Sequence, residues 1–162
     1  MKKLLWIVLA IALMLCGCGK GSNGNPDKNV PFVVPTKFFT LEAPASWKDD
    51  CSYECKETAG GGLTLTFREK KSYESGLGGL LFSVKVMPAG EDFTVLPNYD
   101  PLGRITNEEG KVYNIILLCP TGTEYSEETQ AKYAEMEKDI PGILESIYYN
   151  WDYEFSPIPI MP

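Results

Sequence analysis

Short segments in which apolar and polar residues alternate constrain the fold of this chain more than any other feature. Leu63, Leu65 and Phe67 alternate with threonine and arginine, and a second apolar row of the same spacing runs from Leu80 to Val86. Successive side chains of a β-strand point to opposite faces of the sheet, so each row predicts a strand with one buried face. Glycine and proline residues mark the turns between them. The sequence therefore predicts an antiparallel sheet of short strands.

Two later segments are predicted to pair as a β-hairpin. Residues 103–108 and 111–119 flank the turn Asn107-Glu108-Glu109-Gly110. The second segment contains an unbroken apolar run, residues 115–118. Such a run is typical of a central strand that is covered on both faces.

A helix is predicted after the last of these strands. Tyr133, Met136 and Ile140 recur at helical spacing. Ser126 is expected to cap the helix, because the acidic residues that follow it suit the positive end of the helix dipole. Pro141 is expected to break or kink the helix. These patterns predict an α+β fold, in which a twisted antiparallel β-sheet of about six strands is flanked by a C-terminal helix.

The N-terminal segment has the pattern of an export signal. Lys2 and Lys3 precede an apolar run from Leu4 to Leu15, which is about as long as a signal-peptide core and short for a membrane-spanning helix. The run ends in Leu15-Cys16-Gly17-Cys18, which resembles the bacterial lipobox of Leu, two small residues and Cys. The resemblance implies cleavage after Gly17 and lipidation of Cys18. The alternative is a plain secretory signal with incidental cysteines.

These observations predict four regions. They are a lipoprotein signal peptide (1–17), a lipidated Cys with a flexible tether (18–35), a single α+β domain (36–150) and a proline-rich C-terminal tail (151–162). The tether is rich in glycine, asparagine and serine, which cannot build a core. Its apolar, proline-flanked end at residues 30–35 is expected to dock as an extended edge segment. The tail is interpreted as a loosely packed, extended terminus, with a proline-rich ligand as the alternative.

Composition narrows the classes of function. The sequence contains no histidine, which excludes Ser-His-Asp and Cys-His catalysis, histidine-ligated zinc and a histidine pH switch. Removal of residues 1–17 would remove two lysines and no acid, so 13 basic residues would face 22 acidic ones and the net charge would change from −7 to −9. This balance argues against a nucleic-acid partner. We expect no enzymatic activity and no cofactor.

Three cysteines would remain beside the lipidated one in an oxidising compartment. Cys51 and Cys55 share one face of a predicted strand, about 13 Å apart, which is too far for a disulfide. The favoured interpretation is that Cys51, Cys55 and Cys119 are buried thiols. The alternatives are a disulfide to Cys119, a local bridge if the chain turns at Ser52-Tyr53, and metal or redox chemistry.

Other chemically suggestive clusters have simpler explanations. The acidic pairs Asp49-Asp50 and Glu108-Glu109 lack the spacing of a calcium loop, so no metal site is expected. The glycine runs near residues 60 and 78 lack the Lys-Ser/Thr pair of a phosphate-binding loop. Most aromatic residues are expected in the core, although one set could line a groove for a sugar or a peptide: Phe93, Tyr99, Tyr113, Tyr125 and Trp151.

Several stretches resemble a family of small, uncharacterised lipoproteins of Gram-positive, clostridial-type bacteria. They are Pro44-Ala45-Ser46-Trp47, Gly78 to Val84, Leu117 to Thr121 and the Tyr-x-x-Met pattern of Tyr133 and Met136. The resemblance covers residues 36–149, and the plan of that family is similar to the PsbP-like α/β sandwich. It implies a fold and transfers no catalytic or binding residue.

The expected function follows from anchoring and from the lack of catalytic groups. We expect a lipid-anchored protein on the extracytoplasmic face of the cell membrane, whose non-catalytic domain binds a protein or another cell-envelope component. The alternatives are a small-ligand or metal-binding module and, less favoured, a carboxylate-based enzyme.

Overall fold

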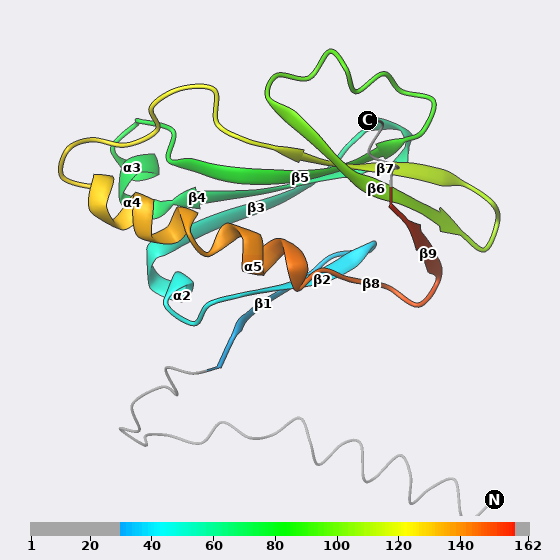
Figure 1. Ribbon diagram of the computed structural model, residues 1–162, viewed down its shortest axis with the longest axis horizontal. Helices are drawn as coiled ribbons and strands as arrows, with labels where there is room; N and C mark the ends of the chain where they lie inside the picture. The colour runs from blue at the N-terminus through cyan, green and yellow to red at the C-terminus, as the bar shows by residue number, and fades with distance from the viewer. Residues whose placement is uncertain (1–29, 158–162) are drawn as a thin grey trace, which may run out of the picture.

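The computed structural model describes residues 30–157 as two antiparallel β-sheets with short helices (Figure 1). The six-stranded sheet has the order β3-β4-β5-β7-β6-β9, and the three-stranded sheet has the order β1-β2-β8. The strands are β1 (Phe32–Pro35), β2 (Phe39–Ala43), β3 (Cys51–Glu57), β4 (Leu63–Glu69), β5 (Leu80–Pro88), β6 (Tyr99–Asn107), β7 (Val112–Leu118), β8 (Tyr148–Tyr149) and β9 (Tyr153–Ser156). The helices are α2 (Trp47–Asp50), α3 (Lys70–Glu74), α4 (Gln130–Glu137) and α5 (Ile140–Glu145), and a 3₁₀ turn spans Ala59–Gly61.

The hydrophobic core lies on one side of the six-stranded sheet. Figure 1 shows α4, α5 and the three-stranded sheet on that side. Leu41 of β2, Phe67 of β4, Phe82 of β5 and Met136 of α4 belong to one buried cluster. None of the helices within residues 30–157 is long and apolar enough to cross a membrane.

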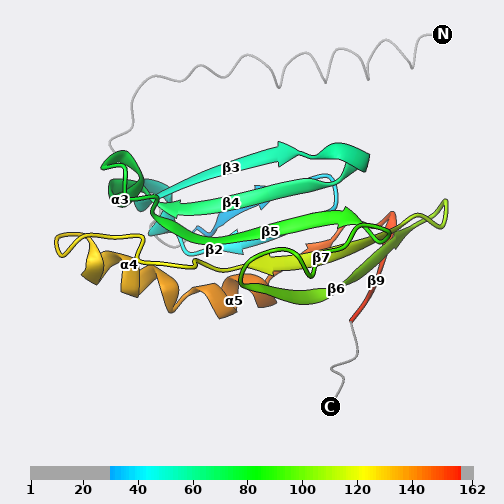
Figure 2. The ribbon, with the colours of Figure 1, turned by 90° about the horizontal axis from the view of Figure 1, so that it is seen from above.

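The predicted hairpin and the predicted central strand are confirmed. β6 and β7 pair antiparallel around the turn at residues 107–110, and β7 lies between β5 and β6. Ile115 contributes to the main core, whereas its neighbour Ile116 is fully buried on the other face. The loop of residues 89–98 lies over that second face (Figures 1 and 2), with Phe93 and Leu96 half-buried in it. The apolar run of β7 is therefore covered on both sides.

The prediction of about six antiparallel strands describes the larger sheet, but the chain also forms a second sheet that the sequence patterns did not predict. β2 belongs to this second sheet, where it pairs with β1 from the end of the predicted tether. Thr36 fixes this pairing, because its hydroxyl donates to the carbonyl of Phe39 at 2.7 Å and accepts from the amide of Phe39 at 3.0 Å. The expected docking of residues 30–35 as an extended edge segment takes the form of β1.

The start of the predicted tail also belongs to the fold. Residues 151–162 were expected to be a loosely packed terminus, but residues 153–156 form β9 at the edge of the six-stranded sheet. Phe155 of β9 lies against Gly103, where a Cβ atom would be only 2.2 Å from its ring. The same ring stacks on Tyr149 with centroids 4.4 Å apart, which joins the edges of the two sheets. Because Gly103 of β6 has no side chain, the ring of Phe155 can pack against it and β9 can pair with β6.

Asn150 fixes the turn between β8 of the smaller sheet and β9 of the larger sheet through hydrogen bonds. Its side-chain amide donates to the carbonyl oxygens of Thr36 and Lys37 at 3.1 and 2.8 Å, and its backbone amide donates to Phe38 at 3.0 Å. The β8–β9 turn is therefore tied to the β1–β2 turn. No periodic pattern in the sequence indicates such a contact.

The helical prediction is confirmed in its buried face and corrected at its start. Tyr133 and Met136 are buried, and Pro141 lies in the first turn of α5, after a break in the helix. However, α4 begins at Gln130 with Thr129 at its N-cap position, and Ser126 caps only the preceding turn, where its hydroxyl accepts from the Thr129 amide at 3.4 Å. Instead, Thr129 turns inward and its hydroxyl accepts a hydrogen bond from Ser72 at 2.8 Å. The acidic residues 127 and 128 lie in the turn before the helix.

A buried glutamate organises the connection between β4 and β5, residues 69–79. The carboxylate of Glu69 accepts hydrogen bonds from the backbone amides of Lys71 at 3.1 Å and Ser72 at 2.7 Å. Glu69 is 1% exposed, so these amides have little access to water. The carboxylate therefore caps α3 and fixes the connection between β4 and β5.

Replacing Glu69 by alanine is expected to lower the free energy of unfolding by about 1–3 kcal/mol, because the amides that it caps would stay buried without acceptors. Urea denaturation of Glu69→Ala and of the control Glu74→Ala, at an exposed position of the same helix, measures the effect. Equal losses in the two variants would contradict this role for Glu69.

Candidate functional site

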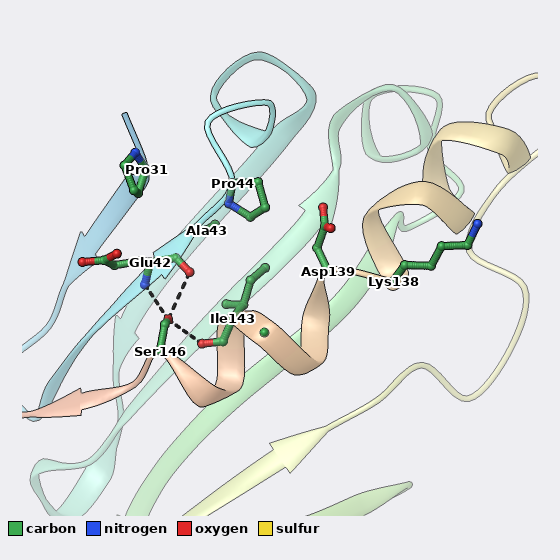
Figure 3. A pocket seen from close by; sticks show the side chains of 9 residues that line it. Pro31, Glu42, Ala43, Pro44, Lys138, Asp139, Ile143 and Ser146 are labelled. Carbon is green, nitrogen blue, oxygen red and sulfur yellow. Dashed lines mark hydrogen bonds between the residues drawn. The ribbon is translucent and has the colours of Figure 1, made fainter. Parts of the chain in front are cut away.

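A groove of about 400 Å³ lies between β2 and α5 (Figure 3). The side of β2 contributes Glu42, Ala43 and Pro44, and the helical side contributes Lys138, Asp139, Gly142, Ile143 and Ser146. A Cβ atom at Gly142 would meet no heavy atom within 4 Å, so this residue leaves the helical wall open. The volume lies in the range of small-ligand pockets.

The hydroxyl of Ser146 is occupied by structural hydrogen bonds. β8 pairs with β2 only at Phe39 and Thr40, so the backbone of Glu42 has no strand partner on that side. The Ser146 oxygen accepts from the amide of Glu42 at 2.9 Å, and its hydrogen points among the carbonyl oxygens of Glu42 and Ile143 at 3.1 and 2.6 Å. Figure 3 shows these contacts as dashed lines. Ser146 therefore closes the open edge of β2 and is not a free nucleophile.

Asp139 is oriented by the indole of Trp47. The ring nitrogen of Trp47 donates to the Asp139 carboxylate at 3.0 Å, and Trp47 itself is 1% exposed. Asp139 occupies the N-cap position of α5 without capping it through its side chain. One carboxylate oxygen is thus committed to the core, while the residue still lines the groove.

The ionic groups at the rim of the groove are Glu42 and Lys138, which carry opposite charges. Both residues are exposed, and neither forms a salt bridge with a described residue. Figure 3 shows their charged ends directed away from the floor of the groove. The groove can therefore hold a small or side-chain-sized ligand, but it does not bring a nucleophile and a base together.

A second hollow, of about 380 Å³, lies beside the β8–β9 turn. We call it the Trp151 notch and define it by its lining residues Thr106, Asn107, Glu108, Trp151, Asp152, Tyr153 and Glu154. The side chain of Trp151 is 86% exposed. Burial, followed by the negative charge of Asp152, raises the pKa of Tyr153. The notch therefore combines an open aromatic face with an acidic lining.

The three cysteines differ in their surroundings. Cys51 is buried, Cys55 is exposed and Cys119 is half-buried, and all are free thiols. Burial raises the pKa of Cys51 to about 12, and burial also raises the pKa of Cys119. The expectation of a buried thiol does not describe Cys55, because β3 is an edge strand whose second half is exposed. Cys18, the predicted lipidation site, lies outside the described residues.

The other predicted clusters do not come together as sites. Asp50 forms a salt bridge with Lys132 at 2.8 Å. Within residues 30–157, no group of three His, Cys, Asp or Glu residues could hold a metal ion. The aromatic set does not line one groove: Tyr113 packs on Phe38 in the core, Phe93 pairs with Tyr99, Tyr125 pairs with Tyr133, and Trp151 lines the notch.

Comparison with protein-family models, with curated proteins and with solved structures finds no match to this chain. The candidate sites therefore rest on their own geometry. The sequence patterns pointed to Trp151 and, separately, to Glu108, but not to their sharing one hollow, and they did not identify Ser146, Asp139 or Glu42 as neighbours. Their sequence separation, 104 residues for Ser146 and Glu42, leaves no local signal.

Thiol alkylation under native conditions is expected to distinguish the cysteines. Cys55 is exposed and should react with iodoacetamide at pH 8 well before Cys51, whose buried thiol has a pKa raised to about 12. Peptide mass spectrometry of the time course measures both rates, and alkylation in urea provides the control for equal access. Equal native rates at the two positions would contradict the described packing of β3.

Proposed function

We propose that this protein is an exported lipoprotein, anchored through lipid on Cys18 to the extracytoplasmic face of the cell membrane. The lipobox-like sequence at residues 15–18 supports the anchor. The glycine- and asparagine-rich residues that follow have the composition of a spacer. The described sheets begin at β1, after that spacer, so the domain has its own fold beyond the predicted anchor.

We also propose membership in the small clostridial-type lipoprotein family, with a PsbP-like α/β sandwich. The support is the α+β architecture of two antiparallel sheets with C-terminal helices. The stretches that carry the resemblance have structural positions: Trp47 is buried, and the Tyr133 hydroxyl donates to the carbonyl of Leu80. They account for a shared fold and imply no activity.

The domain acts by binding a protein or another cell-envelope component, without catalysis. The observation that carries this proposal is the exposure of Trp151, which is 86% exposed and follows Tyr148, itself 70% exposed, by three residues. Large aromatic side chains contribute much of the binding free energy of protein interfaces. An aromatic side chain that stays in water loses the favourable free energy of burial. In the groove, Ser146 is hydrogen-bonded to the backbone of Glu42 and Asp139 to the indole of Trp47, so both side chains have structural partners.

A small-ligand module is the second candidate, and the groove between β2 and α5 favours it. Its volume of about 400 Å³ and the open wall at Gly142 leave room for a ligand. A Cβ atom at position 142 meets no heavy atom within 4 Å, so Gly142→Leu adds a side chain at this wall, and loss of a ligand's thermal shift in this variant would assign that ligand to the groove.

Substitution of Cys18 by serine is expected to release the protein from the membrane. Serine lacks the thiolate that accepts the diacylglyceryl group, so the variant should lose both the lipid mass and the membrane association. Fractionation and intact-mass measurement of the full chain expressed in a Gram-positive host test this, with Cys16→Ser as the matched control. Membrane retention and an acyl mass in Cys18→Ser would overturn the anchor.

Site-specific photocrosslinking tests the binding role. A benzoylphenylalanine at position 151 is expected to crosslink a cell-envelope component, whereas the same group at Tyr73, which is 49% exposed on α3, should not. Crosslinks of the same kind at both positions, or at neither, would count against a binding surface at the β8–β9 turn.

A further inference from the structure

The Trp151 notch has the components of a binding site for an organic cation. Its aromatic element is the indole of Trp151, which is 86% exposed in a hollow of about 380 Å³. An aromatic face attracts a cation through its quadrupole, and tryptophan does so best. The acidic element is formed by Glu108, Asp152 and Glu154 of the same lining.

The negative charge of the notch is not neutralised by the chain itself. None of the three carboxylates forms a salt bridge with a described residue. The bases of the β6–β7 hairpin are engaged elsewhere: Arg104 donates to Asn114 at 3.1 Å, and Lys111 donates to the carbonyl of Gly60 at 3.1 Å. A partner would therefore have to supply the positive charge.

The spacing of the acids favours an organic cation over a metal ion. Among residues 30–157, these carboxylates do not come close enough together to form a metal-binding group. They line the same hollow as the Trp151 ring, and an aromatic ring is not a ligand for hard metal ions, which bind oxygen atoms. A neutral sugar could stack on Trp151 but would leave the acidic charge uncompensated. A membrane surface rich in anionic lipid would be repelled by it.

We propose that the Trp151 notch binds a lysine or arginine side chain presented by an extended, basic segment of a protein partner. The cationic head lies over Trp151 and between the carboxylates of Asp152 and Glu154. This inference rests on the proposed binding function and names its partner class. Ion pairing and cation–π attraction then act on the same group.

Two features of the surroundings suit a protein segment in particular. β9 is an edge strand of the six-stranded sheet, so its outer backbone groups are available to an extended chain beside the notch. The chain as a whole carries a net charge of −7, and the notch adds acids of one sign at one end of the fold. Such a charge steers basic partners toward the surface and makes association sensitive to salt.

Fluorescence titration of the full chain, purified from membranes in detergent, tests the proposal. The probe is a ten-residue peptide of alternating lysine and threonine, and its counterpart carries glutamine in place of lysine. The lysine peptide should change the Trp151 emission and bind at least about tenfold tighter than the glutamine peptide. Of the other two tryptophans, Trp47 is 1% exposed and should not respond to either peptide, and Trp6 lies in the predicted signal peptide and is removed on processing.

Matched variants assign the effect to the notch. Trp151→Ala and the double variant Asp152→Asn with Glu154→Gln should each weaken binding of the lysine peptide about five- to tenfold by calorimetry. Tyr73→Ala, at an exposed aromatic residue of α3, should leave it unchanged.

Equal affinity for the lysine and glutamine peptides would overturn the inference. So would Trp151-dependent binding of a neutral chitin tetramer or of phosphatidylglycerol vesicles in place of the basic peptide. If the photocrosslinker at position 151 still captures a protein in these cases, the binding function stands and only the basic partner fails. If it captures nothing, both fail.

Discussion

The buried indole of Trp47 is the contact on which the arrangement of the two halves of this domain depends. It packs against Phe67 and Phe82 of the six-stranded sheet, with ring centroids 6.0 and 6.4 Å apart. Its nitrogen donates to Asp139 at the start of α5. The side chain of Trp47, at the start of α2, therefore joins the six-stranded sheet to the C-terminal helices. Asp139 also lines the groove, so the hydrogen bond from Trp47 orients one of the groove's side chains.

The sequence predicted those elements whose physics is local. Alternation identified the buried faces of β4 and β5, the turn at residues 107–110 identified the hairpin, and helical spacing identified Tyr133 and Met136. It did not predict the second sheet, because β1 and β8 are short and owe their places to Thr36 and Asn150. It also missed α3, since the cap that Glu69 supplies depends on burial. Tertiary contacts decided these elements, and a single sequence does not encode them as a pattern.

The candidate sites were less predictable than the fold for the same reason. Trp151 was named in an aromatic set, but the structure disperses that set and leaves Trp151 in one hollow with Glu108 of the β6–β7 turn, Asp152 of the β8–β9 turn and Glu154 of β9. The groove joins residues about a hundred positions apart, such as Glu42 and Ser146, which are separated by 104 residues. Composition did indicate the character of one surface. The chain contains no histidine and carries more acidic than basic residues, which agrees with the acidic lining of the Trp151 notch.

A double-mutant cycle between Trp47 and Asp139 tests this account most directly. Trp47→Phe removes the indole donor and keeps an aromatic ring, and Asp139→Ala removes the acceptor. The free energies of unfolding of the two single variants and of the double variant, measured in urea, give the coupling. A hydrogen bond to a charged group in this half-buried position predicts a coupling of about 1–3 kcal/mol. Additive effects, within about 0.5 kcal/mol, would show that the contact does not join the sheet to the helices.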